Sequence, residues 1–194
     1  MAPCRADLAP GASPLDIAPV DASYKAANDN SSGISPSGNY TYSSSTHDLT
    51  VTRNRTINLA GGTYYFNNVA LNSGAVMVIQ NKVTMYVTGQ FSAGPGTITN
   101  QTGVPSNFIL YSSFSCSGGS CVTLPAGSSL YGAIYARDAT ITFGVGGQFY
   151  GSVVGNTVDD ANGSSIHYDE ALKNIAGIGG VVKFAILLGS WTER

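Results

Sequence analysis

The chain has 194 residues and a formal net charge of −2, and only 10% of its residues are Asp, Glu, Lys or Arg. Nucleic-acid binding requires several cations that neutralise phosphates together, so this composition argues against a nucleic-acid partner. A helical bundle is excluded as well, because 24 glycines accompany frequent Ser, Thr, Tyr and Val, which favour short strands and turns. The length corresponds to about one domain.

Residues 1–48 differ in composition from the rest of the chain. They are rich in Ala, Pro, Asp, Asn and Ser and show no sustained hydrophobic period. We interpret them as a flexible leader or linker, one part of which is a candidate cap for the domain that follows. Met1–Gly11 lacks the apolar run of a signal peptide.

Residues 49–172 contain short β-like runs that alternate with turns rich in Gly, Asn and Ser. Tyr131–Ala136 aligns with Tyr150–Gly155 at a shift of 19, which matches Tyr to Tyr and Gly to Gly. Tyrosines recur every 18 to 25 residues, and the series is Tyr65, Tyr86, Tyr111, Tyr131, Tyr150 and Tyr168. In this alignment Tyr111 and Tyr131 are neighbours in successive coils. We predict an all-β fold, a right-handed parallel β-helix (β-solenoid) with coils of about 18–25 residues and these tyrosines in one ladder. A sandwich of antiparallel hairpins is the rival interpretation.

Charge is almost absent from the middle of the chain, where Lys82 is the only charged residue between Thr56 and Ala136. Stacked coils would place repeated like charges about 4.8 Å apart, so neutral side chains suit such a stack. Alternating apolar residues are expected to point inward and form the core: Ile57, Leu59, Val69, Leu71, Val76, Val78, Val83, Val87, Ile109, Val122, Leu124, Ile134, Ile141 and Val153.

The C-terminal segment 173–194 is expected to cap the open end of the stack, because an uncovered sheet edge invites association. The longest apolar run, Ile175–Leu188, contains Lys183 and is shorter than the roughly 20 residues needed to cross a bilayer. We therefore predict no transmembrane segment.

Two of the three cysteines lie close together in the sequence Cys-Ser-Gly-Gly-Ser-Cys. The central glycines permit a tight turn, so a disulfide between Cys116 and Cys121 is favoured over free thiols, and a metal site lacks further ligands nearby. Such a pair suggests an oxidising compartment. Cys4 is left over in the leader.

The densest group of titratable residues lies near the end of the repeats and comprises Asp159, Asp160, His167, Asp169 and Glu170. Paired carboxylates on a β-helix can act as general acid and base on a polysaccharide. The simpler interpretation is structural, with Asp169 capping a helix that begins near Glu170. We expect no metal ion and no cofactor, because the preceding coils supply almost no further acids.

Three Thr-x-Thr segments, Thr50–Thr52, Thr97–Thr99 and Thr140–Thr142, raise the alternative of an ice-binding face. Regular threonine ladders on a flat solenoid face can order water. The segments recur only at about every second coil, so the ordinary strand propensity of threonine is the preferred explanation.

An ordered series of motifs carries a resemblance to a known domain family. The series comprises Gly62–Phe66, Val83–Val87, Leu130–Ala136, Phe149–Gly155 and His167–Leu172. In this order the motifs resemble an uncharacterised bacterial β-solenoid domain that follows PilX-type pilin N-terminal helices in pilus-associated and cell-surface proteins. This chain departs from the usual pattern because it begins with a polar leader instead of a hydrophobic helix.

The resemblance implies export to the extracellular space or the bacterial cell surface, the periplasmic face included. It implies partners among pilus components or surface glycans, and it transfers no catalytic residue. We therefore expect a non-enzymatic structural or adhesive module. End-to-end self-association is a further expectation for an open stack.

Overall fold

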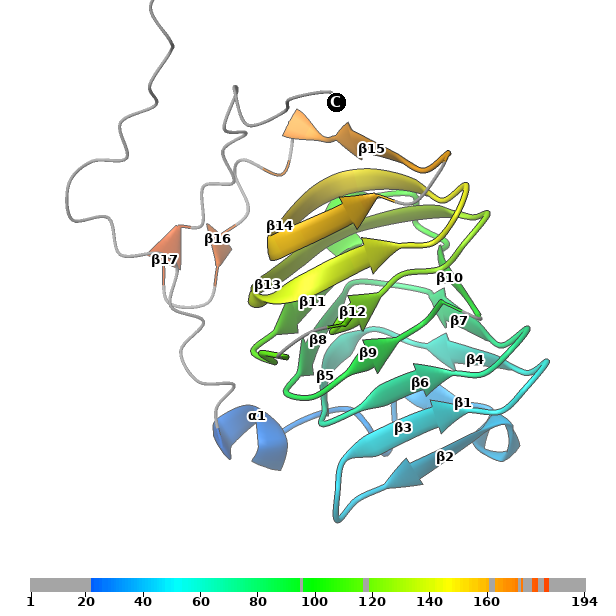
Figure 1. Cartoon of the computed structure of the whole chain (residues 1–194). Coiled ribbons are helices and arrows are strands. Elements are labelled where there is room, and N and C mark those ends of the chain that lie inside the picture. Colours follow the sequence, from blue (N-terminus) through cyan, green and yellow to red (C-terminus); the bar gives the residue numbers. More distant parts are fainter. Residues whose placement is uncertain are drawn as a thin grey trace, which may run out of the picture.

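The computed structural model describes residues 22–94, 96–116, 119–160, 163–170, 172, 176–177 and 180–181. The chain winds into a β-solenoid of about six turns with almost no helix (Figure 1). The predicted all-β solenoid is thereby confirmed. Within the described part of the chain, no helix is long and apolar enough to span a membrane.

Three sheet faces surround the core. Face one comprises β1 (Ile34–Ser35), β4 (Thr56–Leu59), β7 (Val76–Ile79) and β10 (Thr97–Asn100). Face two comprises β5 (Gly62–Phe66), β8 (Val83–Val87), β11 (Phe108–Ser112), the first halves of β13 (Ser129–Phe143) and β14 (Gln148–Asp160), and β15 (Ser165–Tyr168). Face three comprises β2 (Tyr40–Ser43), β3 (Asp48–Val51), β6 (Val69–Leu71), β9 (Phe91–Ser92), β12 (Val122–Thr123), and the second halves of β13 and β14.

The smaller elements lie at the ends and corners. They are α1 (Ala22–Ala26), the 3₁₀ turns η1 (Ser37–Asn39) and η2 (Pro105–Asn107), and a two-stranded hairpin of β16 (Ala176–Gly177) and β17 (Gly180–Val181). Within the three faces the pairing is parallel, except that β1 and β2 run antiparallel to the first coil. The predicted cap segment 173–194 lies outside the described residues apart from β16 and β17, and Cys4 lies outside them too.

The number of residues in a coil depends on how many sheet faces the coil contains. Thr56 pairs in register with Val76, and Tyr150 pairs with His167, so a coil shortens from 20 residues to 17 along the stack. In the described chain, face one has no strand after β10, so the last coils are two-sided (Figure 1). One coil is longer, because Phe91 pairs with Val122 across an inserted loop.

Face one ends at Asn100, whose side-chain amide is buried. Asn100 is 5% exposed, and its Nδ2 donates hydrogen bonds to the carbonyl oxygens of Val104 (2.9 Å) and Tyr131 (3.0 Å). Its Oδ1 accepts from the backbone N–H and the hydroxyl of Thr102. The polar side chain therefore satisfies backbone groups at the point where the sheet stops.

The interior is a continuous apolar core built from alternate residues of each strand. Most of the expected core residues lie in it, but Val76, Val78 and Ile109 do not. In β7 the inward positions are Met77 and Ile79, which are 0% exposed. The prediction was wrong there because both alternating sets of β7 are apolar, so periodicity cannot identify the buried set.

Residues 22–47 cover the first coil, although their composition suggests a flexible leader. β1 pairs with β4 on face one, and β2 pairs with β3 on face three. On face two, side chains replace a strand: Asp29 Oδ2 accepts from the Thr63 N–H (2.8 Å), and the Asn30 amide bonds both the N–H and the C=O of Tyr65. The folded part thus begins before residue 49, and the described part of the leader supplies an N-terminal cap.

A row of tyrosines lies on the outer surface of face two and is nevertheless buried. Tyr65, Tyr86, Tyr111 and Tyr135 are each at most 7% exposed. Tyr86 and Tyr111 stack with ring centroids 5.3 Å apart, and Tyr24 of α1 stacks on Tyr86 at 4.4 Å. This outer cluster therefore ties α1 to the side of the solenoid.

Three buried phenols are expected to ionise late. Burial raises the pKa of Tyr64 to about 12, and it also raises the pKa values of Tyr86 and Tyr111. The folded state favours the neutral phenols. For Tyr64 this contribution to stability is complete below the ordinary pKa of 10.0 and is lost as the pH rises through about 12. A pH titration that follows tyrosinate absorbance and circular dichroism should show late ionisation coupled to unfolding.

A Tyr64→Phe variant provides the control for this titration, because it should contain one late-ionising group fewer. If no tyrosine ionises late in the native chain, the buried positions of these rings are contradicted.

Candidate functional site

A hollow of about 280 Å³ opens on the outer surface of face two, near the C-terminal end of the solenoid. Its volume is close to the lower end of the roughly 300–1,000 Å³ that is usual for small-molecule sites. The last three strands of face two, the turn after β15, the loop before η2 and η2 itself contribute its lining. These residues are Tyr131, Tyr150, His167, Tyr168, Asp169 and Glu170, with Gly103 and Pro105. The hollow therefore combines aromatic rings with two carboxyl groups.

Three of these rings form a stack. Tyr131 and Tyr150 have ring centroids 4.8 Å apart with planes 14° from parallel, and Tyr150 and His167 are 4.6 Å apart at 12°. The spacing matches the roughly 4.8 Å separation of neighbouring strands, because the three residues occupy equivalent positions on β13, β14 and β15. His167 Nε2 hydrogen-bonds Gln148 Oε1 at 3.1 Å, which holds the exposed imidazole in the stack.

The predicted single tyrosine ladder is therefore two rows. Tyr111 pairs in register with Tyr135, not with Tyr131, so Tyr131 and Tyr150 belong to the exposed stack. Tyr168 pairs with Gly151 and belongs to neither row. The predicted register was wrong because Tyr131 and Tyr135 are four residues apart and point to the same side of the strand, so the two alignments look alike.

The carboxyl groups of the hollow lie just after β15. The N–H of Asp169 donates to the carbonyl oxygen of Gly151 (3.2 Å), and the carbonyl oxygen of Asp169 accepts from the N–H of Leu172 (3.1 Å). This contact closes a tight turn in which Glu170 and Leu172 are 3₁₀-helical, and the rest of the helix expected to begin near Glu170 lies outside the described residues. Glu170 is exposed, whereas Leu172 is buried among the outer tyrosines.

The five titratable residues singled out in the sequence are divided between two places. His167, Asp169 and Glu170 line the hollow on face two. Asp159 and Asp160 lie at the end of β14 on face three, where the Ser164 hydroxyl donates to Asp160. Within the described chain, no group of three His, Cys, Asp or Glu side chains could hold a metal ion.

The remaining sequence features lie away from the hollow. The Sγ atoms of Cys116 and Cys121 lie at bonding distance with their Cα atoms 5.9 Å apart, which confirms the predicted disulfide, and the bond closes part of the loop between β11 and β12. Thr97–Thr99 lies on face one, whereas Thr50 and Thr142 lie on face three with Ala70 and Ser92 among the positions between them. The threonines thus form no continuous ladder.

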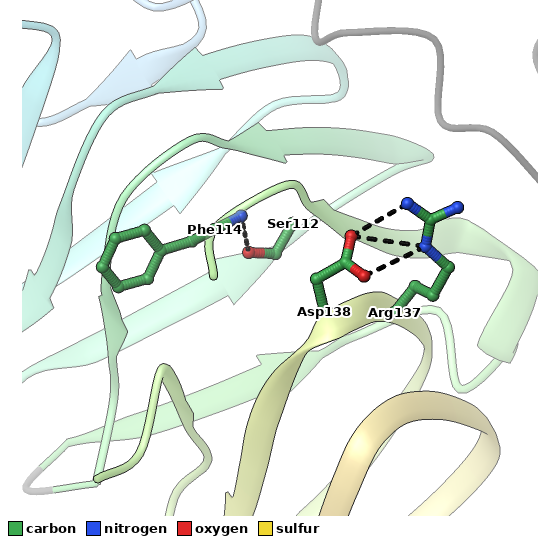
Figure 2. A network of polar contacts seen from close by, with 4 residues as sticks. All are labelled: Ser112, Phe114, Arg137 and Asp138. Carbon is green, nitrogen blue, oxygen red and sulfur yellow. Dashed lines mark hydrogen bonds and ion pairs between the residues drawn. The ribbon is translucent and has the colours of Figure 1, made fainter. Parts of the chain in front are cut away.

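Arg137 and Asp138 lie at the corner where β13 turns from face two to face three (Figure 2). They form an exposed ion pair with an Nη2–Oδ2 distance of 3.0 Å, at a shift in the β13–β14 register. Nearby, the Ser112 hydroxyl oxygen accepts a hydrogen bond from the N–H of Phe114. The adjoining hollow of about 30 Å³ has room for about one water molecule.

The fold and the hollow define an N-terminally capped β-solenoid domain with an exposed aromatic and acidic surface. The chain belongs to the family described as a domain of unknown function, DUF7305, which matches residues 18–175. Neither the curated proteins nor the solved structures contain a match. The matched range begins before the first coil, so it includes the N-terminal cap.

Proposed function

We propose that this chain is a non-enzymatic structural and adhesive module on the outside of a bacterial cell, associated with a pilus or another surface structure, and that it binds surface glycans. The observation that carries this proposal is the hollow of about 280 Å³ in which the ring stack meets Asp169 and Glu170.

The chemistry of the hollow suits a hydroxyl-rich ligand. Tyr150 lies between two other rings, so it presents its edge and its hydroxyl to solvent. His167 is exposed at the end of the stack and offers one open ring face to the apolar side of a sugar. Carboxylates accept hydrogen bonds from sugar hydroxyls, and phenols both donate and accept them.

Charge narrows the ligand class to neutral or amino sugars. Among the described residues, the lining of the hollow includes Asp169 and Glu170 but no Lys or Arg. An anionic sugar would meet like charges there without a cation to offset them. A neutral saccharide, or one that carries an ammonium group, meets no such repulsion.

Two further features support a structural role outside the cell. On faces two and three the parallel ladders continue from the first coil to the last described coil, which favours a rigid spacer. The disulfide at Cys116 and Cys121 is typical of an oxidising compartment. The sequence motifs that resemble pilus-associated domains point to the same location.

A saccharide panel tests the adhesive function. We expect the full chain to bind neutral or amino saccharides, and we expect His167→Ala and Glu170→Gln variants to bind them at least about tenfold more weakly, which is 1.4 kcal/mol or more. An Asp159→Asn variant is the matched control, because it removes a carboxylate on face three and should leave binding unchanged. Absence of saccharide binding, or equal loss in the control, would overturn the proposed site.

The same panel tests whether the protein is an enzyme. We expect every saccharide to be recovered intact after incubation. Cleavage that disappears in an Asp169→Asn variant would instead assign a hydrolase or lyase to the hollow.

A further inference from the structure

Among the described strands, face three has an unpaired edge at each end of the solenoid. Its first strand is β2 and its last is the second half of β14, and no described strand pairs with the outer edge of either. An exposed edge presents unpaired N–H and C=O groups and is a template for another strand. We propose that copies of this chain associate head to tail through these two edges, with β2 of one copy pairing with the second half of β14 of the next.

The edge at the C-terminal end is open because β15 covers only part of β14. β15 pairs with Gln148–Gly151, so residues 152–160 pair with β13 on one edge and have no described strand on the other. Asn156, Thr157, Asp159 and Asp160 are exposed along this edge. The segment contains neither Pro nor Lys, the residues that commonly protect an edge strand from association.

At the N-terminal end the three faces are closed to different degrees. On face two, the side chains of Asp29 and Asn30, together with the Asp29 N–H, occupy the backbone groups of β5 and offer no strand edge. On face one, β1 has only two residues. On face three, β2 has four residues and makes a full pairing with β3, so it presents the longest strand edge of the cap.

The strand directions fit a continuous sheet. β14 runs parallel to β3 through the successive parallel pairs of face three, whereas β2 runs antiparallel to β3. A second copy stacked along the axis would therefore place its β2 antiparallel to the second half of β14. Antiparallel pairs have the more stable hydrogen-bond geometry per residue.

The charges at the two ends are complementary. Exposed Arg53 and Arg55 follow β3 at the corner after face three, and exposed Asp159 and Asp160 end β14 at the same corner of the last coil. In the first coils, the Asn54 side chain lies against Gly74 at this corner.

The same corner continues at the other end of the stack, where Gly146 lies 4.0 Å from Gly127 and Gly163 lies 3.9 Å from Gly146, each measured from an ideal Cβ to a Cα atom. In a stacked pair, the arginines of one copy would approach the aspartates of the next with β2 between them. Long arginine side chains can span part of that separation, and the attraction steers the copies into register.

Sedimentation velocity of the full chain tests the proposal. We expect self-association that grows with protein concentration at an ionic strength of about 0.01 M, where the Debye length is roughly 30 Å. At about 1 M salt the Debye length falls to roughly 3 Å, and we expect the association constant to fall at least about tenfold. A chain that stays monomeric at low salt up to high concentration would overturn the proposal.

Charge-swapped variants identify the surface. Asp159→Arg combined with Asp160→Arg should lose self-association, and so should Arg53→Asp combined with Arg55→Asp. An equal mixture of the two double variants should regain it, because the reversed ends again meet opposite charges. Lys82→Glu, which reverses a charge away from both ends, is the matched control and should behave as the native chain does.

Association that survives both double variants, or a mixture that stays monomeric, would overturn head-to-tail pairing. Circular dichroism melts of each variant show whether it is folded. This proposal does not depend on glycan binding, because His167 and Glu170 are unchanged in every variant.

Discussion

Replacing Gly151 with alanine is expected to destabilise the protein by about 3–5 kcal/mol, a large share of the stability of an ordinary domain. Gly151 has φ +149°, a backbone conformation that L residues rarely adopt. An added Cβ would lie 2.9 Å from the carbonyl carbon of Gly132 in the neighbouring coil and would overlap its oxygen. Because the obstacle is backbone, β13 and β14 would have to separate where they pair.

Thermal unfolding measures this effect. For a chain of this size, about 3–5 kcal/mol corresponds to a fall in Tm of roughly 6–20 °C. Gly38→Ala is the control, because an added Cβ meets nothing within 4 Å there, and the change should stay within about 0.5 kcal/mol. If the two variants melt at the same temperature, the close approach of Gly132 and Gly151 is contradicted.

The same two glycines show why the solenoid could be predicted from the sequence. Tyr131-Gly132 and Tyr150-Gly151 repeat at a shift of 19, and the structure pairs them in that register. At each of the two glycines the backbone lies close to the preceding coil, because an added Cβ would meet Gly132 at Gly151 and Phe108 at Gly132. The same close approach in successive coils leaves a repeated glycine in the sequence. The shortage of charged residues also reflects stacking. Charges are missing from the coils that stack in the ladders, where like charges in neighbouring coils would repel each other.

Features that leave no such repeat could not be predicted. Tyr131 and Tyr135 are an even number of residues apart, so their side chains point to the same side of the strand. The side to which a tyrosine points therefore does not show which of the two is the neighbour of Tyr111. His167 takes the third place in the exposed stack, where a search for tyrosine selects Tyr168 instead. The hollow forms only where that stack meets the turn after β15. This meeting point can be located only when the register of the paired strands is known.

Part of the leader was expected to be a cap, but the form of this cap could not be predicted from the sequence for a different reason. Asn30 and Asp29 replace a strand with side-chain hydrogen bonds, which produce no hydrophobic period. Asn30 is only 1% exposed, and its amide lies opposite the backbone of Tyr65 as a neighbouring strand would. Polar composition therefore suggests a flexible leader where the structure has a specific cap.

Replacing Asn30 with leucine is expected to cost about 3 kcal/mol, because it leaves the buried N–H and C=O of Tyr65 without partners at about 1–3 kcal/mol for each group. The hydrogen bond from Asn30 Nδ2 to the Tyr42 hydroxyl (3.0 Å) is lost as well. The measurement is chemical or thermal unfolding, with a fall in Tm of roughly 10 °C. Asn81→Leu is the matched control, because Asn81 is exposed and water can replace its bond to the carbonyl oxygen of Ala60.

An Asn30→Asp variant separates hydrogen bonding from packing. The carboxylate could still accept from the Tyr65 N–H, but it would face the Tyr65 carbonyl oxygen without a proton to donate, so burial and this contact should raise the pKa of the new carboxyl. A raised pKa in the folded state means that stability is present at low pH and is lost as the pH rises. The deficit in Tm relative to the native chain should therefore shrink between about pH 7 and about pH 4. A deficit that does not change with pH, or an Asn30→Leu variant as stable as Asn81→Leu, would show that the amide does not close the edge of face two.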